Sequence, residues 1–136
     1  MKTVRIHRPE EIQLTRIGDR AGDPPHPIFH SLAPSELDSS MVFHEFGSDS
    51  EPQLAELDFI PHAEVVIHKH DDAEILYVLR GEMHFGNEVL KAGASIYIPG
   101  DTFYGFRAGP DGLRLLNFRG RADVSFYPKA KHYRVC

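Results

Sequence analysis

The residues best suited to chemistry are two histidines and a glutamate near the middle of the chain. His68 and His70 are separated by one residue, and Glu74 follows four positions later. Residues two apart on a strand project from the same face, about 6.6 Å apart along the chain. The two imidazoles can therefore converge on one ion. Asp71 and Asp72 are typical of a turn, which would return the Glu74 carboxylate to the same place.

Two imidazoles and one carboxylate on one side of an ion leave open positions for water, dioxygen or a chelating substrate. Such ligands suit Fe, Mn, Ni, Co and Zn, and the order of affinities does not reveal which metal a cell supplies. Three ionisable groups are costly to bury unless they are paired or metal-bound, which favours a metal site over a metal-free pocket. We expect one divalent transition metal bound by His68, His70 and Glu74.

The elements that position these residues are expected to be short strands. From Met41 onward, apolar residues come in short clusters separated by Gly, Pro, Asn and Asp, without a sustained helical period. This pattern predicts an all-β sandwich or barrel. The residue types at 86–87 and 109–112 predict chain reversals. The expected strands are residues 41–46, 53–59, 64–68, 75–80, 83–85, 88–91, 95–98, 102–107 and 113–119.

The first 40 residues have a different character. Five prolines, at positions 9, 24, 25, 27 and 34, interrupt any strand or helix that would run through this segment. We therefore expect an irregular N-terminal arm over residues 1–40, a barrel over residues 41–125 and a C-terminal tail over residues 126–136.

The central segment resembles the first motif of the cupin superfamily. His68-x-His70-x-x-x-Glu74, followed by six residues and Gly81, matches that motif, with His62 in place of the expected leading glycine. The resemblance covers about residues 55–120. It implies a double-stranded β-helix, a jelly-roll barrel whose mouth holds the site, and pairing of two copies into a homodimer.

The second motif of the superfamily is only partly present. Gly93, five residues and Pro99 match it, whereas position 101, usually glycine, is Asp101. Position 104, which in metal-binding cupins usually supplies the last histidine ligand, is Tyr104. A phenol is a less favourable ligand than a neutral imidazole because it must first lose its proton.

The main interpretation of this departure is a site with three ligands. In it, His68, His70 and Glu74 hold the metal, while Tyr104 hydrogen-bonds substrate or metal-bound water, or acts as a general acid or base. Alternatively Tyr104 binds the ion directly. His62 or His84 is a further candidate ligand, because strand alternation back from His68 would place His62 on the same face and His84 lies on the strand after Gly81.

Two functions are compatible with such a pocket. Metal-dependent cupins include dioxygenases, isomerases and lyases, so the resemblance implies a metal-dependent enzyme that acts on a small oxygenated organic molecule. The alternative is a non-catalytic module that binds or senses a small molecule. We favour the enzyme, with Tyr104 and Glu74 as its catalytic residues.

Composition excludes other classes of function. The net charge is −5 and no basic run follows a face, so nucleic acid is not expected as a partner. The longest apolar run, residues 75–79, is too short to cross a bilayer, and the N-terminal residues are too charged for a signal peptide. Cys136 is the only cysteine, which excludes an intramolecular disulfide. We expect a cytoplasmic protein with a small-molecule substrate and no membrane partner.

Overall fold

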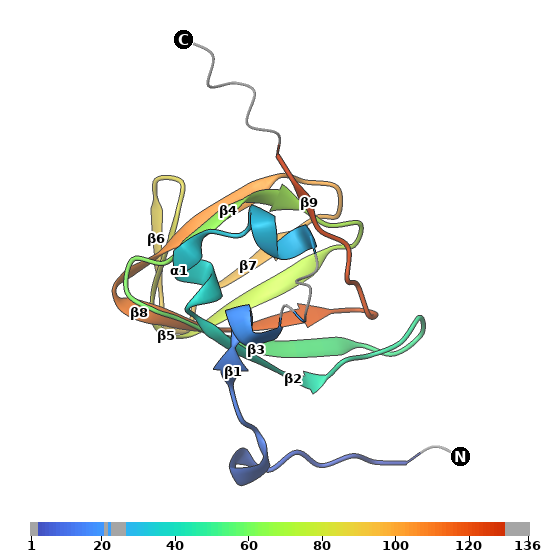
Figure 1. Cartoon of the computed structure of the whole chain (residues 1–136). Helices are drawn as coiled ribbons and strands as arrows, with labels where there is room; N and C mark the ends of the chain where they lie inside the picture. The colour runs from blue at the N-terminus through green and yellow to red at the C-terminus, as the bar shows by residue number, and fades with distance from the viewer. Residues whose placement is uncertain (1–2, 21, 23–26, 130–136) are drawn as a thin grey trace.

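Nine β-strands contain nearly half of the residues that the computed structural model describes, which are 3–20, 22 and 27–129 (Figure 1). The strands are β1 (Thr15–Arg16), β2 (Ser40–Glu45), β3 (Gln53–Phe59), β4 (Glu64–Lys69), β5 (Glu74–Phe85), β6 (Glu88–Lys91), β7 (Ser95–Ile98), β8 (Tyr104–Arg119) and β9 (Tyr127–Pro128). The helical segments are η1 (Pro9–Glu11), η2 (Ile17–Arg20), η3 (Pro27–Ser31) and α1 (Pro34–Leu37). The predicted all-β class is confirmed.

Two long strands, β5 and β8, take part in both layers of the barrel. The C-terminal half of β8 pairs with β3 and with β5, which gives a first sheet in the order β1–β2–β3–β8–β5–β7. The N-terminal half of β8 pairs with β4 and with the far end of β5, which gives a second sheet in the order β9–β4–β8–β5–β6. Because the sheets share these two strands, they close into a barrel (Figure 1).

The chain reversal predicted at residues 109–112 is wrong, and so is the division of β5 at residue 80. β8 continues through this segment, while its register against β5 shifts between the pairs Gly81–Leu113 and Met83–Ala108. The extra residues bulge outward where β8 passes from one sheet to the other. Gly81 and Gly112 both have positive φ there, and a Cβ on Gly81 would lie 2.1 Å from the Gly112 carbonyl oxygen. Glycine at Gly81 allows the strands to cross rather than turn.

The hydrophobic core fills the space between the two sheets. Inward residues alternate along the central strands, as Leu76 and Val78 on β5 and Leu113 and Leu115 on β8 show. This alternation brings side chains from both sheets into one buried cluster. The cluster consists of Phe59, Ala63, Val65, Leu76, Val78, Met83, Ile98, Tyr104, Ala108, Leu113 and Leu115.

The N-terminal arm has little regular structure where the model describes it. Its strand β1 pairs with β2 at the edge of the first sheet, and β2 begins at Ser40. Residues 3–11 are all exposed, and Figure 1 shows this segment running away from the barrel. At the other end, β9 lies within the predicted tail and pairs with β4. Within the described residues, none of the helical segments is long and apolar enough to cross a membrane.

Candidate functional site

The two histidines lie together at the end of β4. His68 is 3% exposed, and its ring centroid is 4.7 Å from that of His70, with the two rings nearly perpendicular. The Tyr104 ring also lies beside His68, with a centroid separation of 4.5 Å, and its centroid is 6.2 Å from that of His70. The sequence spacing therefore predicted correctly that these two imidazoles approach each other.

Both imidazoles have the same tautomer. His68 Nδ1 lies 2.6 Å from the Val66 carbonyl oxygen, and His70 Nδ1 contacts the carbonyl oxygen of Ser125. Because a carbonyl oxygen only accepts, Nδ1 carries the proton in each ring and Nε2 keeps its lone pair. Burial lowers the pKa of His68 to about 4, and burial together with the charge of Arg119 lowers the pKa of His70. Both rings are neutral at pH 7.

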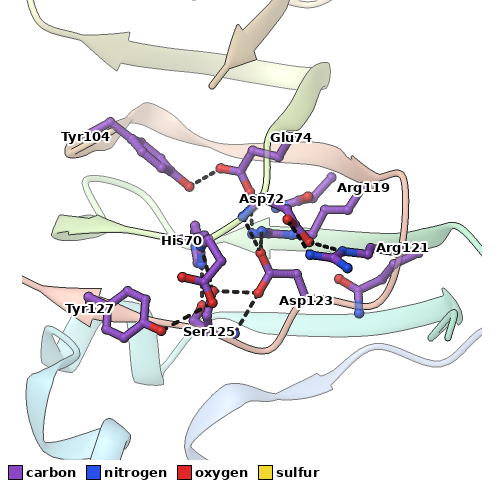
Figure 2. A network of polar contacts seen from close by, with 12 residues as sticks. His70, Asp72, Glu74, Tyr104, Arg119, Arg121, Asp123, Ser125 and Tyr127 are labelled. Atoms are coloured by element: carbon purple, nitrogen blue, oxygen red, sulfur yellow. Dashed lines mark hydrogen bonds and ion pairs between the residues drawn. The ribbon is translucent and has the colours of Figure 1, made fainter. Parts of the chain in front are cut away.

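Both carboxylate oxygens of Glu74 have partners within the protein, and Figure 2 shows Glu74 beside Tyr104 and Arg119. Glu74 is 2% exposed at the start of β5, and its Oε1 accepts a hydrogen bond from the Tyr104 hydroxyl. Its Oε2 forms an ion pair with the buried guanidinium of Arg119 and accepts a hydrogen bond from Asn117 Nδ2 at 3.3 Å. Arg119 also lies 3.3 Å from Asp123 Oδ2. The buried carboxylate charge is therefore balanced within the protein.

Tyr104 replaces the expected histidine and keeps its proton. Burial is the largest cause that raises its pKa, and the adjacent negative charge of Glu74 and the hydrogen bond to it raise the pKa further. A phenol in this environment donates a hydrogen bond rather than acting as an anionic ligand. The Tyr104 hydroxyl thus donates a hydrogen bond to Glu74, a contact that the alternatives drawn from the sequence did not include.

The predicted ligands meet the requirements of a metal ion only in part. His68 and His70 fit, because ligating imidazoles donate the other ring N–H to a fixed acceptor, as both do here. Glu74 does not fit as it lies, since both of its oxygens are occupied. Among the described residues, no three His, Cys, Asp or Glu side chains group closely enough to hold a metal ion. The predicted grouping of Glu74 with both histidines is therefore not formed in this arrangement, because Glu74 bonds Arg119 and Tyr104.

Neither additional histidine joins the site. His62 is exposed in the turn before β4 with φ +62°, a conformation that suits the glycine expected there, and His84 Nε2 contacts Glu82 Oε1 at 2.8 Å. The register of β4 shifts between Val65 and His68, so strand alternation does not extend from His68 back to His62. That bulge also explains why Glu64 is exposed whereas His68 is buried.

The segment after β8 covers the histidines. The Phe126 ring stacks on His68 with a centroid separation of 4.6 Å and an interplanar angle of 16°. Ser125 Oγ accepts a hydrogen bond from the Asp71 amide at 2.8 Å, and Asp123 Oδ2 accepts one from the Asp72 amide at 2.9 Å (Figure 2). These bonds tie the segment to the turn between β4 and β5.

Sequence reasoning missed several residues of the site. Asn117 and Arg119 continue the inward alternation of Leu113 and Leu115 on β8, so two polar residues at core positions were a usable signal. Phe126 carried no comparable signal, because its place depends on how the chain returns across the barrel. Asn117 Oδ1 is buried without a hydrogen-bond partner among the described residues.

A large cavity lies beside the site. It has a volume of about 1170 Å³, and Tyr104 forms part of its wall. Its other walls include Ile67 on β4, His84 on β5, and Phe103 and Arg107 beside or on β8. It is a broad groove along β4 and β8, so the two histidines and Glu74 do not line it.

Comparisons with known proteins agree with this architecture. A family model described as a cupin domain matches residues 55–118. Among curated proteins, none matches the sequence. An RmlC-like cupin from Shewanella frigidimarina is 19% identical and has a TM-score of 0.63, with 96% of each chain covered.

Two further solved structures have the same fold. An RmlC-like cupin from Ralstonia eutropha is 11% identical, with 93% of this chain and 80% of that chain covered and a TM-score of 0.67. The polyketide cyclase RemF from Streptomyces resistomycificus is 20% identical, with 95% and 87% covered and a TM-score of 0.67. Residues 55–118 of this chain therefore form a cupin domain, and the chain has the double-stranded β-helix fold of these solved structures.

Proposed function

We propose that this chain is a metal-dependent enzyme that acts on a small oxygenated organic molecule, such as a ketone, an enol or a hydroxy acid. The observation that carries the proposal is the shared tautomer of His68 and His70, whose Nδ1–H groups are both bonded to backbone carbonyls. Two neutral imidazoles with fixed orientation and free Nε2 lone pairs are the donors that divalent transition metals prefer.

His68 and His70 would hold the metal through Nε2, and Glu74 would join them through Oε1 if it exchanged its bond with Tyr104. The bonds of Arg119 and Asn117 to Oε2 would keep the carboxylate in place during that exchange. When bound, a divalent metal supplies a Lewis acid that polarises a carbonyl or enolate oxygen. RemF, which has this fold, is a polyketide cyclase, and polyketides are oxygenated molecules of this kind.

Tyr104 would act as the acid. It holds a proton on its hydroxyl oxygen and donates it in a hydrogen bond to Glu74 Oε1. A substrate oxygen that takes the place of Glu74 as acceptor would receive this hydrogen bond instead. Phe126 excludes water from one face of His68, which strengthens electrostatic interactions in the site.

A second candidate is a metal-free pocket that binds or senses a small molecule. The observation that favours it is the balanced charge of Glu74, whose two oxygens already have partners within the protein. A carboxylate that is satisfied in this way needs no ion for its burial.

Metal analysis of protein purified without added metal distinguishes the two candidates. The proposal predicts about one equivalent of a single transition metal, and loss of that metal in a His68→Ala/His70→Ala double variant. A His62→Ala/His84→Ala double variant is the matched control and should keep its metal. If wild-type protein contains no metal and none of the five metals stabilises it, the metal-free pocket stands.

Tyr104→Phe separates the role of the hydroxyl from metal binding. We expect the variant to retain metal, because the proposal assigns Tyr104 a proton and not a coordination bond. Turnover of a substrate identified with wild-type protein should fall by roughly 10² to 10⁴, the usual contribution of a general acid. Loss of metal from Tyr104→Phe would instead make Tyr104 a ligand.

A further inference from the structure

Asn117 brings an unpaired hydrogen-bond acceptor to the candidate site. Its side-chain oxygen, Oδ1, is buried and accepts no hydrogen bond from the described residues. A buried oxygen that exchanges its bonds to water for none is costly, so nearly all such atoms in native proteins have a partner. A bound group is therefore expected to supply the partner of Asn117 Oδ1.

The orientation of the Asn117 amide is fixed by Glu74. Asn117 Nδ2 donates a hydrogen bond to Glu74 Oε2 at 3.3 Å, and the same carboxylate oxygen forms an ion pair with Arg119. A flipped amide would place Oδ1, which only accepts, against an ionised carboxylate, which also only accepts. Oδ1 therefore points away from Glu74, and its partner must be an N–H or O–H group.

The residues beside Asn117 in the sheet have no side-chain donor. In the register of the first sheet, Asn117 lies between Ala55 of β3 and Leu76 of β5, and both are buried apolar residues. An ordered water usually makes about three hydrogen bonds, and apolar neighbours of this kind offer it few partners. A ligand that brings a hydroxyl together with its own carbon skeleton suits this position better than a water molecule does.

Tyr104 and Asn117 bind the two oxygens of the same carboxylate. The Tyr104 hydroxyl donates to Glu74 Oε1, as the dashed line in Figure 2 shows, and Asn117 Nδ2 donates to Oε2. One small molecule can therefore contact both side chains, of which Tyr104 offers a donor and Asn117 an acceptor. A hydroxyl next to a carbonyl has the complementary pair, because the carbonyl oxygen accepts from Tyr104 and the hydroxyl donates to Asn117.

We propose that Asn117 determines the specificity of the site, because its Oδ1 accepts a hydrogen bond from a hydroxyl next to the carbonyl group of the substrate. This role rests on the proposed function, in which a small oxygenated molecule binds beside Tyr104, and it narrows the substrate class to hydroxyketones and their enediols. A hydroxyketone whose hydroxyl is methylated leaves Asn117 Oδ1 unpaired. It should therefore bind more weakly, by about tenfold or more.

Carbon NMR of protein labelled at the side-chain carbonyl carbon of asparagine tests this role. The chain has two asparagines, Asn117 and Asn87, and Asn87 is exposed in the turn between β5 and β6, so it is an internal control. An Asn87→Ser variant assigns the two resonances. Hydroxyacetone should move the Asn117 resonance downfield until binding saturates, because Oδ1 gains a hydrogen bond, and should leave Asn87 in place. Methoxyacetone at the same concentrations should move neither resonance.

Spectra recorded in EDTA and with added Zn²⁺ separate the role of Asn117 from the metal-dependent function. A preference for hydroxyacetone in either condition supports the role of Asn117, whatever the metal analysis shows about the proposed enzyme. An Asn117 resonance that responds alike to the two compounds, or to neither of them, in both conditions would overturn the proposal.

Asn117→Leu provides a second readout. This variant lacks the acceptor, so it should bind hydroxyacetone and methoxyacetone with equal affinity in NMR titrations that follow the ligand signals. Asn87→Leu is the matched control and should keep the preference for hydroxyacetone. A preference that survives in Asn117→Leu would assign the selectivity to another residue. The wild-type spectra need no change at position 117, so they decide the question even if Asn117→Leu does not fold.

Discussion

At the scale of single residues, the buried carboxylate of Glu74 is stabilised by the guanidinium of Arg119, the last residue of β8. Both side chains are almost completely buried, at 1% exposure for Glu74 and 7% for Arg119. Removal of one partner leaves the other as an uncompensated charge in a medium of low dielectric constant. The pair is therefore a more sensitive point of the barrel than any exposed ion pair.

We expect Arg119→Met to destabilise the fold by about 3–5 kcal/mol, measured by urea unfolding. Arg121→Met is the matched control, since Arg121 forms an exposed ion pair with Asp72, and its loss should change stability little. Adding Glu74→Gln to Arg119→Met should restore part of the loss. Equal losses in the two single variants would contradict a buried ion pair.

Glu36 on α1 gives a prediction about pH. Its Oε1 is buried without a hydrogen-bond partner among the described residues, and burial raises the pKa of Glu36 to about 7. The unfolded chain loses this proton near pH 4.5, so the folded state binds more protons between pH 4.5 and about 7. Stability should therefore fall as pH rises through this window and level off above it.

Glu36→Gln replaces the carboxyl with an amide that does not ionise. This variant should therefore be more stable than wild type at pH 8, by up to about 3 kcal/mol, whereas the two should have nearly the same stability at pH 4.5. Thermal unfolding at several pH values measures the difference. Glu10→Gln, on the exposed arm, should leave the pH profile unchanged. A parallel profile for wild type and Glu36→Gln would show that the carboxyl is solvated.

At the scale of elements, the crossing of β5 and β8 depends on glycine. We expect Gly81→Ala to destabilise the fold by about 3–4 kcal/mol, because the new Cβ meets the Gly112 carbonyl and φ is positive. Gly86→Ala is the control: φ is also positive, but no atom lies within 4 Å of its Cβ, so about 1 kcal/mol is expected. Chemical denaturation of both variants measures this. Similar losses of stability in the two variants would mean that β5 and β8 can move apart at the crossing to accommodate the new Cβ.

The segment over the site is a second element whose role can be measured. Phe126→Ala should expose His68 and speed its acylation by diethyl pyrocarbonate on the order of tenfold, followed by peptide mass spectrometry. Phe103→Ala, in the wall of the groove along β4 and β8, should not change this rate. An unchanged rate in Phe126→Ala would mean that other residues shield the histidine.

At the scale of the whole molecule, the homodimer that the family resemblance implies would make stability depend on protein concentration. Since association stabilises the folded state, the thermal midpoint of wild type should then fall by a few degrees for each tenfold dilution. Differential scanning fluorimetry over two decades of concentration measures this dependence, and a flat curve would argue against assembly.

Much of the fold could be predicted from the order of residues. The strands Gln53–Phe59, Glu88–Lys91 and Ser95–Ile98 have the predicted bounds, because alternating apolar residues and turn residues act over a few positions. β8 could not be predicted as one strand. Residues 109–112 have turn chemistry, and only pairing with β3, β4 and β5 shows that the chain bulges and continues.

The candidate site, like the fold, could be predicted only in part from the sequence. The sequence by itself determined that the rings of His68 and His70 lie close together, because spacing along one strand acts locally. Only the tertiary structure decided that Glu74 bonds Arg119 and Tyr104 and that Phe126 covers His68. Those partners come from strands and segments distant in the chain, and contacts between distant residues depend on how the barrel closes rather than on any local pattern.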